Sequence, residues 1–282
     1  MTETKRIIKA GWRLLREEGF LTLTEDVLKK VSRREFYIRT PAPDERVRAR
    51  NLEVLKAGAP DKLSIPPLNL VELATGTTNL EQFLEGGRIA VMDVDNLLRK
   101  NSLNLYDLEA ILDFGCGCGR ATRYLKAIKK VCGCDFNSEA VNWAKDHLSF
   151  AEFTVNQLQP PTNYQDNEFD LILVLSVLTH MPEELGRQWM GEFRRLIRRQ
   201  GFLVLSLHGE SFSEQLTVEE RRRFLDGHVV VRESRHAGRN RCAVFHPNEY
   251  VREQLAKEFH LLDFLPRGLQ NDQDLYLLQN LK

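Results

Sequence analysis

The second half of the chain alternates short apolar runs with stretches whose apolar residues recur at helical spacing. The apolar runs lie at 110–114, 131–135, 151–155, 169–175 and 202–207. The helical stretches lie at 119–129, 137–147 and 183–199. Short strands that alternate with helices are typical of a doubly wound α/β fold with a mostly parallel sheet. Two further runs, 258–265 and 273–279, predict a closing hairpin-like pair, which brings the expected strands to seven.

A glycine-rich turn follows the first of these strands. Residues 111–120 read ILDFGCGCGR, with an acid at 113 and glycine at 115, 117 and 119. A strand, a glycine turn and a helix together bring bare backbone N–H groups against a ligand, because a Cβ would block the approach or forbid the backbone angles. The spacing G-x-G-x-G differs from the G-x-G-x-x-G that suits a pyrophosphate. The next strand, VCGCDF at 131–136, ends in Asp135, where an acid can accept hydrogen bonds from ribose hydroxyls.

These features resemble the class I S-adenosylmethionine-dependent methyltransferases, and the resemblance covers about residues 108–282. EFDLILVLSVLTHMPEE at 168–184 matches the fourth-strand motif of that family, and RLIRRQGFLVLSLHGE at 195–210 matches the helix, turn and strand that follow. In the second motif, Arg199-Gln200-Gly201 stands where Pro-Gly-Gly is frequent. The resemblance implies a Rossmann-like, doubly wound, seven-stranded sheet and S-adenosyl-L-methionine as the cofactor.

The resemblance also implies which residues contact the cofactor. The glycine turn would meet the methionyl part, Asp135 the ribose hydroxyls, and the residues after the second and third strands the adenine. Asn156 departs from the commoner Asp, but an amide oxygen accepts the same hydrogen bond from adenine N6. The expected cofactor-contacting residues are Asp113, Gly115, Cys116, Gly117, Gly119, Asp135, Phe136, Asn137, Asn156, Gln157, Ser176 and Val177. The alternative for Asp113 is a structural role as a helix-capping acid. The alternative for Asp135 is that it only ends the strand.

Methyl transfer requires alignment of nucleophile, carbon and sulfur, and exclusion of water. A hydroxyl acceptor also benefits from a base, and a histidine with a pKa near ~6.5 suits that task at neutral pH. His208, after the fifth strand, and His180, after the fourth, are the two candidates, with His246 as a weaker third and Tyr250 expected to line the same opening. Histidines at such positions also serve as packing or hydrogen-bonding residues, and an amine acceptor requires no base.

The chain before residue 108 is expected to be largely helical. Residues 3–36 and 44–57 carry helical patterns, and Pro66-Pro67 forces an extended entry into an apolar, structured stretch at 64–101. Residues 208–250 interrupt the α/β pattern at the sheet edge where ligands bind, and we expect a substrate lid there rather than a surface loop. The expected divisions are an N-terminal helical extension at 1–60, a lead-in over the cofactor site at 61–107, and a methyltransferase domain at 108–282 with the insertion at 208–250.

The amino-acid composition narrows the classes of partner and the cellular locations expected for the protein. The chain has 40 basic and 40 acidic residues, which argues against a general binder of nucleic-acid backbones. No apolar run approaches the ~20 residues that span a bilayer, and the start lacks the apolar core of a secretory signal. Five cysteines fit a reducing cytoplasm. Two Cys-x-Cys pairs, at 116 and 118 and at 132 and 134, could be read as a zinc site, but small buried thiols explain them better.

Several functions remain in competition. The favoured one is methyl transfer to an oxygen or nitrogen of a small molecule, such as a sugar or a natural-product intermediate by analogy with a bacterial subgroup. The alternatives are an RNA or protein methyltransferase, which gains from the basic residues at 29–50, and a catalytically silent cofactor-binding domain. A nicotinamide dehydrogenase is excluded by the glycine spacing and by the fourth-strand run.

Overall fold

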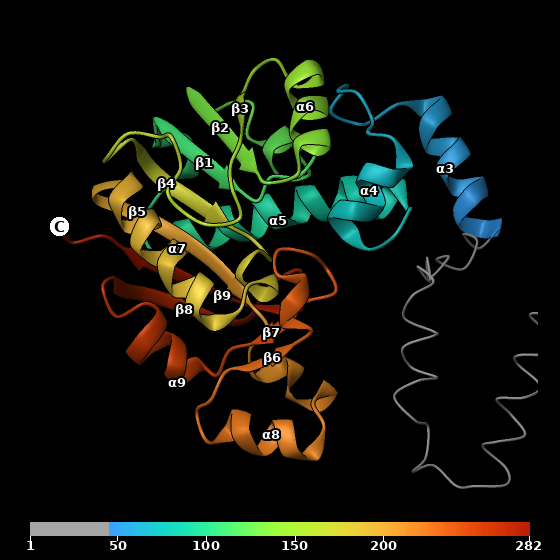
Figure 1. Cartoon of the computed structure of the whole chain (residues 1–282). Coiled ribbons are helices and arrows are strands. Elements are labelled where there is room, and N and C mark those ends of the chain that lie inside the picture. Colours follow the sequence, from blue (N-terminus) through green and yellow to red (C-terminus); the bar gives the residue numbers. More distant parts are fainter. Residues whose placement is uncertain (1–44) are drawn as a thin grey trace, which may run out of the picture. The chain divides into compact units, whose positions relative to one another are not determined.

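The computed structural model describes residues 45–282 (Figure 1). Most of the expected N-terminal extension, including the helical pattern at 3–36, lies outside the described residues. The predicted helix at 44–57 is present as α3, Glu45–Ala57.

A single sheet of seven strands forms the centre of the molecule, in the order β3-β2-β1-β4-β5-β9-β8. The first five strands of this order pair in parallel, whereas β9 is antiparallel to both β5 and β8. The prediction of a Rossmann-like, doubly wound sheet with a closing antiparallel pair is therefore confirmed. The strands are β1 (Ala110–Phe114), β2 (Lys130–Asp135), β3 (Glu152–Val155), β4 (Phe169–Val174), β5 (Ile197–Leu207), β8 (His260–Leu269) and β9 (Gln273–Gln279).

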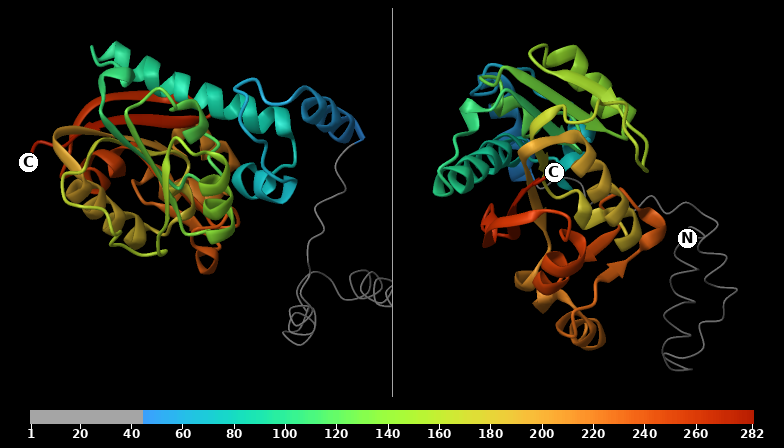
Figure 2. Two further views of the ribbon diagram at one scale, coloured as in Figure 1. Left: turned by 90° about the horizontal axis from the view of Figure 1, so that it is seen from above. Right: turned by 90° about the vertical axis from the view of Figure 1, so that its left-hand side faces the viewer.

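Helices cover both faces of the sheet. The long helix α5 (Leu80–Lys100) runs along one face, where Ala90, Val94 and Leu97 pack against apolar side chains of the central strands (Figure 2). On the other face, Trp189 and Phe193 of α7 (Glu183–Leu196) pack on Phe114. The remaining helices before β3 are α4 (Leu68–Thr75) and α6 (Ser138–His147).

The helix predicted at 119–129 is wrong. The structure has a single 3-10 turn there, Thr122–Tyr124. Tertiary contacts fix this segment: the Arg120 carbonyl lies 2.0 Å from where a Cβ on Gly87 would stand, so α5 packs directly on the backbone that follows the glycine turn. The Arg123 side chain is fully buried and forms an ion pair with Asp61. These tertiary contacts impose a conformation other than the helix that the apolar spacing predicted.

Residues 208–250 form a small folded insertion. Its elements are a 3-10 segment (Glu210–Gln215), α8 (Val218–Leu225), β6 (Val230–Arg232), a 3-10 turn (Ser234–His236), β7 (Ala243–Phe245) and α9 (Asn248–Tyr250). The strands β6 and β7 pair in antiparallel fashion, and a bridge joins His208 to Phe245. The insertion has its own apolar cluster of Phe212, Leu216, Phe224, Val230 and Phe245.

Candidate functional site

The glycine turn after β1 requires glycine for steric reasons. Gly115, Gly117 and Gly119 have φ values of 76°, 52° and 83°, a region that other residues adopt rarely. A Cβ on Gly115 would stand 2.4 Å from Cγ2 of Val177, and one on Gly119 would stand 2.4 Å from Leu148. The turn therefore lies directly against the segment that follows β4.

Asp135, at the tip of β2, is joined to this turn by hydrogen bonds. Its Oδ2 accepts the Gly117 N–H at 3.0 Å, and its Oδ1 accepts the Asn137 N–H at 2.8 Å. Asn137 in turn caps α6, because its side chain accepts the Ala140 N–H at 2.9 Å. Burial raises the pKa of the Asp135 carboxyl, and the backbone N–H bonds partly oppose that shift. Two sequence-predicted residues, Gly117 and Asp135, thus meet at the carboxyl edge of the sheet.

Asp113 and Cys116 lie beneath the turn rather than at its surface. Asp113 is 3% exposed, and its Oδ2 accepts a hydrogen bond from the Thr122 hydroxyl at 2.5 Å. Burial raises the pKa of this carboxyl to about 6. The Cys116 side chain packs with Val141 and Phe153, and burial raises the pKa of its thiol. The contact of these two residues with a ligand would therefore run through the backbone around them.

The four paired cysteines are all buried free thiols. Within residues 45–282, no group of three or more His, Cys, Asp or Glu side chains is placed to hold a metal ion.

The expected adenine side of the site contains an acceptor that fits an amino group. The Asn156 Oδ1 atom is buried and has no hydrogen-bond partner among the described residues. The Asn156 N–H donates to the Asp135 carbonyl at 3.1 Å, which fixes the residue beside the tip of β2, whereas Gln157 is exposed. An unpaired amide oxygen at this place suits the N6 amino group of adenine. The residues present therefore fit the adenosyl group of the cofactor.

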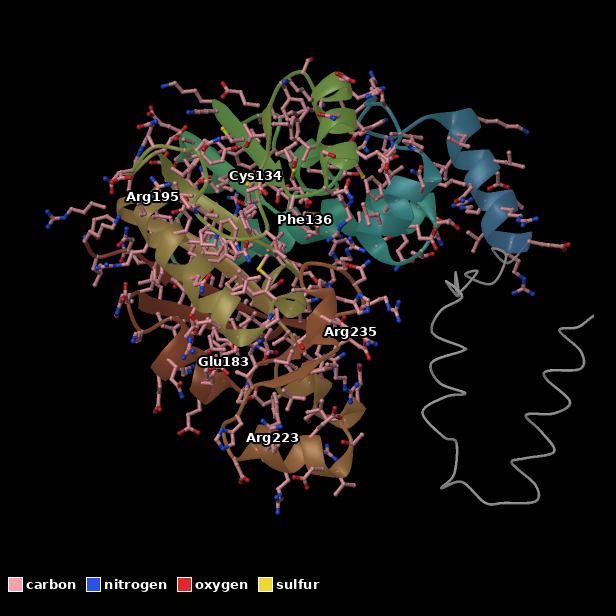
Figure 3. All side chains as sticks on the ribbon, in the orientation of Figure 1. Cys134, Phe136, Glu183, Arg195, Arg223 and Arg235 are labelled. Atoms are coloured by element: carbon pink, nitrogen blue, oxygen red, sulfur yellow. The ribbon has the colours of Figure 1, made fainter. Side chains whose placement is uncertain are left out.

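Phe136 lies between the sheet edge and the insertion (Figure 3). A Cβ on Gly238 would stand 3.1 Å from the Phe136 ring, so the backbone of the insertion approaches that ring closely. The Gly238 N–H also donates to the His180 carbonyl at 2.7 Å. A third contact joins the insertion to α4, where the Asn240 amide donates to the Leu73 carbonyl at 3.0 Å. The insertion therefore crosses the carboxyl edge beside the predicted site.

Ser176, after β4, has a positive φ of 62° and is held by a closed ring of hydrogen bonds. Its N–H donates to the Ser206 hydroxyl at 2.7 Å, that hydroxyl donates to Gln273 Oε1 at 2.7 Å, and Gln273 Nε2 donates to the Ser176 hydroxyl at 2.8 Å. A strained backbone persists where its surroundings fix it, and such residues cluster at functional sites. The sequence does not predict Gln273 as a site residue, because its hydrogen-bond partners are remote in the chain.

Removing the Gln273 side chain is expected to destabilise the protein and to disturb Ser176. Gln273→Ala removes the acceptor of the buried Ser206 hydroxyl and the donor to the half-buried Ser176 hydroxyl, so we expect the free energy of unfolding to fall by about 1–3 kcal/mol. Gln279→Ala is the matched control, since Gln279 lies on the same strand and its side chain bonds Gln200, near the surface. Urea denaturation measures both variants. Equal stabilities of the two variants would contradict a structural role for the ring.

The two histidines proposed as bases lie near each other. Their ring centroids are 6.4 Å apart. His180 Nδ1 lies 2.7 Å from the Cys242 carbonyl, which can only accept, so Nδ1 carries the hydrogen and Nε2 is the unprotonated nitrogen of the neutral ring. Burial lowers the pKa of His180. The insertion therefore supplies the group that orients His180.

His208 is half-buried, as His180 is, whereas His246 is more enclosed. The His208 ring lies 4.2 Å from that of Phe212, and burial together with the proximity of His180 lowers its pKa to about 4. His246 is 2% exposed, and burial lowers its pKa to about 3. Tyr250 is also buried, and its ring lies 6.2 Å from that of His246. A hydrogen bond to the Cys242 carbonyl orients the His180 ring, and His208 has a backbone hydrogen bond to Val244.

Comparison with known proteins agrees with this geometry. Residues 112–205 match a family described as a methyltransferase domain. The fold is similar to that of 1,6-didemethyltoxoflavin-N1-methyltransferase from Burkholderia thailandensis, at 17% identity and a TM-score of 0.51, over 76% of this chain and 86% of that one. It is also similar to magnesium protoporphyrin IX methyltransferase from Synechocystis PCC 6803, at 19% identity and a TM-score of 0.50, over 71% and 87% of the two chains. Both of those structures contain S-adenosylhomocysteine.

Residues 112–205 therefore match a methyltransferase domain, and the overall fold is similar to that of these two solved methyltransferases. Within residues 45–282, no helix has the length and apolar character needed to cross a membrane.

Proposed function

We propose that the chain is a class I S-adenosylmethionine-dependent methyltransferase that transfers a methyl group to an oxygen or nitrogen of a small-molecule acceptor, such as a sugar or a natural-product intermediate. The observation that supports this is the insertion at 208–250, which contacts Phe136, His180 and α4 at the edge where the cofactor binds. A folded segment across this edge favours a compact acceptor over a long polymer. The equal numbers of basic and acidic residues also disfavour RNA.

In this proposal each part of the site has a defined task. Asp135 accepts hydrogen bonds from the ribose, the Asn156 amide oxygen accepts one from adenine, and the glycine turn approaches the methionyl part. Bound S-adenosylmethionine supplies an electrophilic methyl group on sulfur. Where the acceptor is a hydroxyl, His180 takes its proton at Nε2, while the Cys242 carbonyl holds the ring in position.

Two segments of the chain, residues 61–107 and 208–250, are proposed to lie over this site. We propose that residues 61–107 form a lead-in over the cofactor site, because the Cys118 thiol donates to the Leu70 carbonyl at 3.7 Å and Ala74 lies 3.8 Å from the position of a Cβ on Gly117. We assign residues 208–250 as the substrate lid. Both segments would exclude water from the reacting atoms.

A panel assay tests the proposal. The protein is incubated with methyl-labelled S-adenosylmethionine and a panel of sugars, nucleotides, amines, RNA and protein, and mass spectrometry identifies the labelled product. Label on a small molecule is the expected result. Label on RNA or protein alone would favour the alternative methyltransferase functions, and binding of S-adenosylhomocysteine without transfer to any acceptor would favour a silent domain.

A further inference from the structure

The two ends of the insertion at 208–250 are joined to each other by hydrogen bonds. The His246 N–H donates to the His208 carbonyl at 2.8 Å, and the Asn248 N–H donates to Oε1 of Glu210 at 2.9 Å. These four residues form the neck of the insertion, where the segment leaves the sheet and returns to it. Local opening of the insertion therefore depends on how firmly the neck is held.

One carboxyl group of the sheet lies buried against this neck. Asp274, the second residue of β9, is 1% exposed, and its Oδ1 accepts the Arg267 N–H at 2.9 Å, while the Arg267 side chain bonds the Asn271 carbonyl. A Cβ on Gly209 would collide with Oδ2 of Asp274, so glycine is needed for this close approach. Among the described residues, the buried Oδ2 atom has no hydrogen-bond partner. A buried acceptor without a donor is costly, so this atom requires a partner.

A second carboxyl group, that of Glu210, contacts Asp274. Burial and the charge of Glu210 raise the pKa of the Asp274 carboxyl to about 6, and the backbone N–H groups of Arg267 and Glu210 partly oppose that shift. Two carboxylates repel each other, whereas a protonated carboxyl donates a hydrogen bond to a carboxylate. One proton on this pair would therefore give the buried Oδ2 its partner and would join the neck to β9.

We propose that Asp274 and Glu210 share one proton in mildly acidic solution, and that its loss lets the insertion open more readily. The proposal concerns the insertion alone and does not rest on the proposed methyl transfer. The proton passes between the carboxyl pair and water, and no other bond changes. Because the pKa of Asp274 in the folded protein lies above its ordinary 3.8, the closed form gains from this pair at low pH. That gain is lost as the pH rises through about 6.

Other ionisable groups lie close to the pair. Tyr276, two residues further along β9, lies near both carboxyl groups and near Arg252, and burial raises its pKa, so it stays neutral between pH 5 and 8. His208 and His246 titrate in the opposite sense, because burial lowers their pKa values to about 4 and about 3, and their protonation favours opening. The pH profile of the wild type therefore contains both effects. Comparison with a variant that keeps the histidines isolates the carboxyl pair.

Hydrogen exchange of the β6 and β7 amides, corrected for the intrinsic exchange rate at each pH, tests the proposal. Asp274→Asn cannot ionise, keeps an oxygen for the Arg267 N–H and offers an amide donor to Glu210. Opening of the wild type relative to this variant is expected to rise about tenfold from pH 5 to pH 8, as a pKa change from 3.8 to about 6 requires. Asp272→Asn is the matched control, since Asp272 is an exposed acid beside Asp274 whose carbonyl accepts the Ser211 hydroxyl. Its ratio to the wild type should stay level.

Each outcome decides the proposal. A level ratio of wild type to Asp274→Asn between pH 5 and pH 8 overturns it. An equal change in the β1 amides would show that the pair acts on the whole fold rather than on the neck, and this also overturns it. If Asp274→Asn does not fold, Glu210→Gln takes its place, because its amide can donate to Asp274 at every pH. The ratio of wild type to Glu210→Gln should rise over the same range, and a level ratio contradicts the shared proton.

Discussion

Replacing Asp135 with alanine is expected to weaken binding of S-adenosylhomocysteine by about 100-fold. The carboxylate holds the Gly117 and Asn137 N–H groups at 3.0 and 2.8 Å, and its remaining lone pairs are proposed to accept two ribose hydroxyls. A hydrogen bond to a charged group contributes about 1.5–3 kcal/mol, and each 1.4 kcal/mol is about tenfold in affinity. Isothermal titration calorimetry measures the change.

Two control variants separate ribose binding from support of the glycine turn. Asp135→Asn keeps one oxygen acceptor, so we expect a smaller loss, about tenfold. Asp146→Ala removes an exposed acid from α6, the helix that follows the tip of β2, and should change nothing. Unchanged affinity in Asp135→Ala would refute the ribose assignment.

Removal of the His180 side chain is expected to lower kcat by about 10²–10⁴-fold for a hydroxyl acceptor, the usual contribution of a positioned base. The Cys242 carbonyl holds Nδ1–H, which leaves Nε2 to take the proton. S-adenosylhomocysteine binding in His180→Ala should stay close to that of the wild type. The rate is measured with the acceptor found in the panel assay. A normal kcat at saturation would remove His180 as the base.

The pH dependence provides a second measurement on His180. Because burial lowers its pKa below the ordinary 6.5, the ring is neutral and competent as a base at pH 7 and above. The rate should therefore be level between pH 7 and 8 and should decline only as the pH falls below 6.5. Nitrogen-15 NMR should show the Nδ1–H tautomer of His180 in the neutral protein. His147→Ala is the matched control, since His147 Nδ1 also lies 2.8 Å from a carbonyl, that of Trp143, but on an exposed helix surface.

The strand pattern was predictable because it depends on local properties of the chain. Apolar runs at 110–114 and 131–135 correspond closely to β1 and β2, since buried parallel strands need continuous apolar residues. The helix at 119–129 was not predictable by the same reasoning. Its apolar spacing favours a helix, but the close approach of α5 at Gly87 and the burial of Arg123 impose another conformation. In this segment, tertiary packing therefore outweighs the helical preference of the local sequence.

Some features of the candidate site can likewise be predicted from the sequence, and others cannot. The glycine turn and Asp135 can be recognised in the sequence because each follows a strand within a short distance along the chain. The ring that holds Ser176 joins this residue, in the segment after β4, to Ser206 of β5 and Gln273 of β9, and Gln273 lies far from Ser176 in sequence. The hydrogen bond that orients His180 comes from Cys242 in the insertion. Neither contact leaves a periodic or motif signal.

By itself, the sequence determined the alternation of strands and helices, the positions that only glycine can occupy, and the acid at the end of β2. These features follow from backbone sterics and from the burial of apolar residues, which act over a few neighbouring positions. Only the tertiary structure decided which group orients His180, which serine is held at a positive φ, and that Arg123 is buried and paired with Asp61. Those properties depend on side chains brought together from distant parts of the chain, so they exist only once the sheet and its insertion have folded.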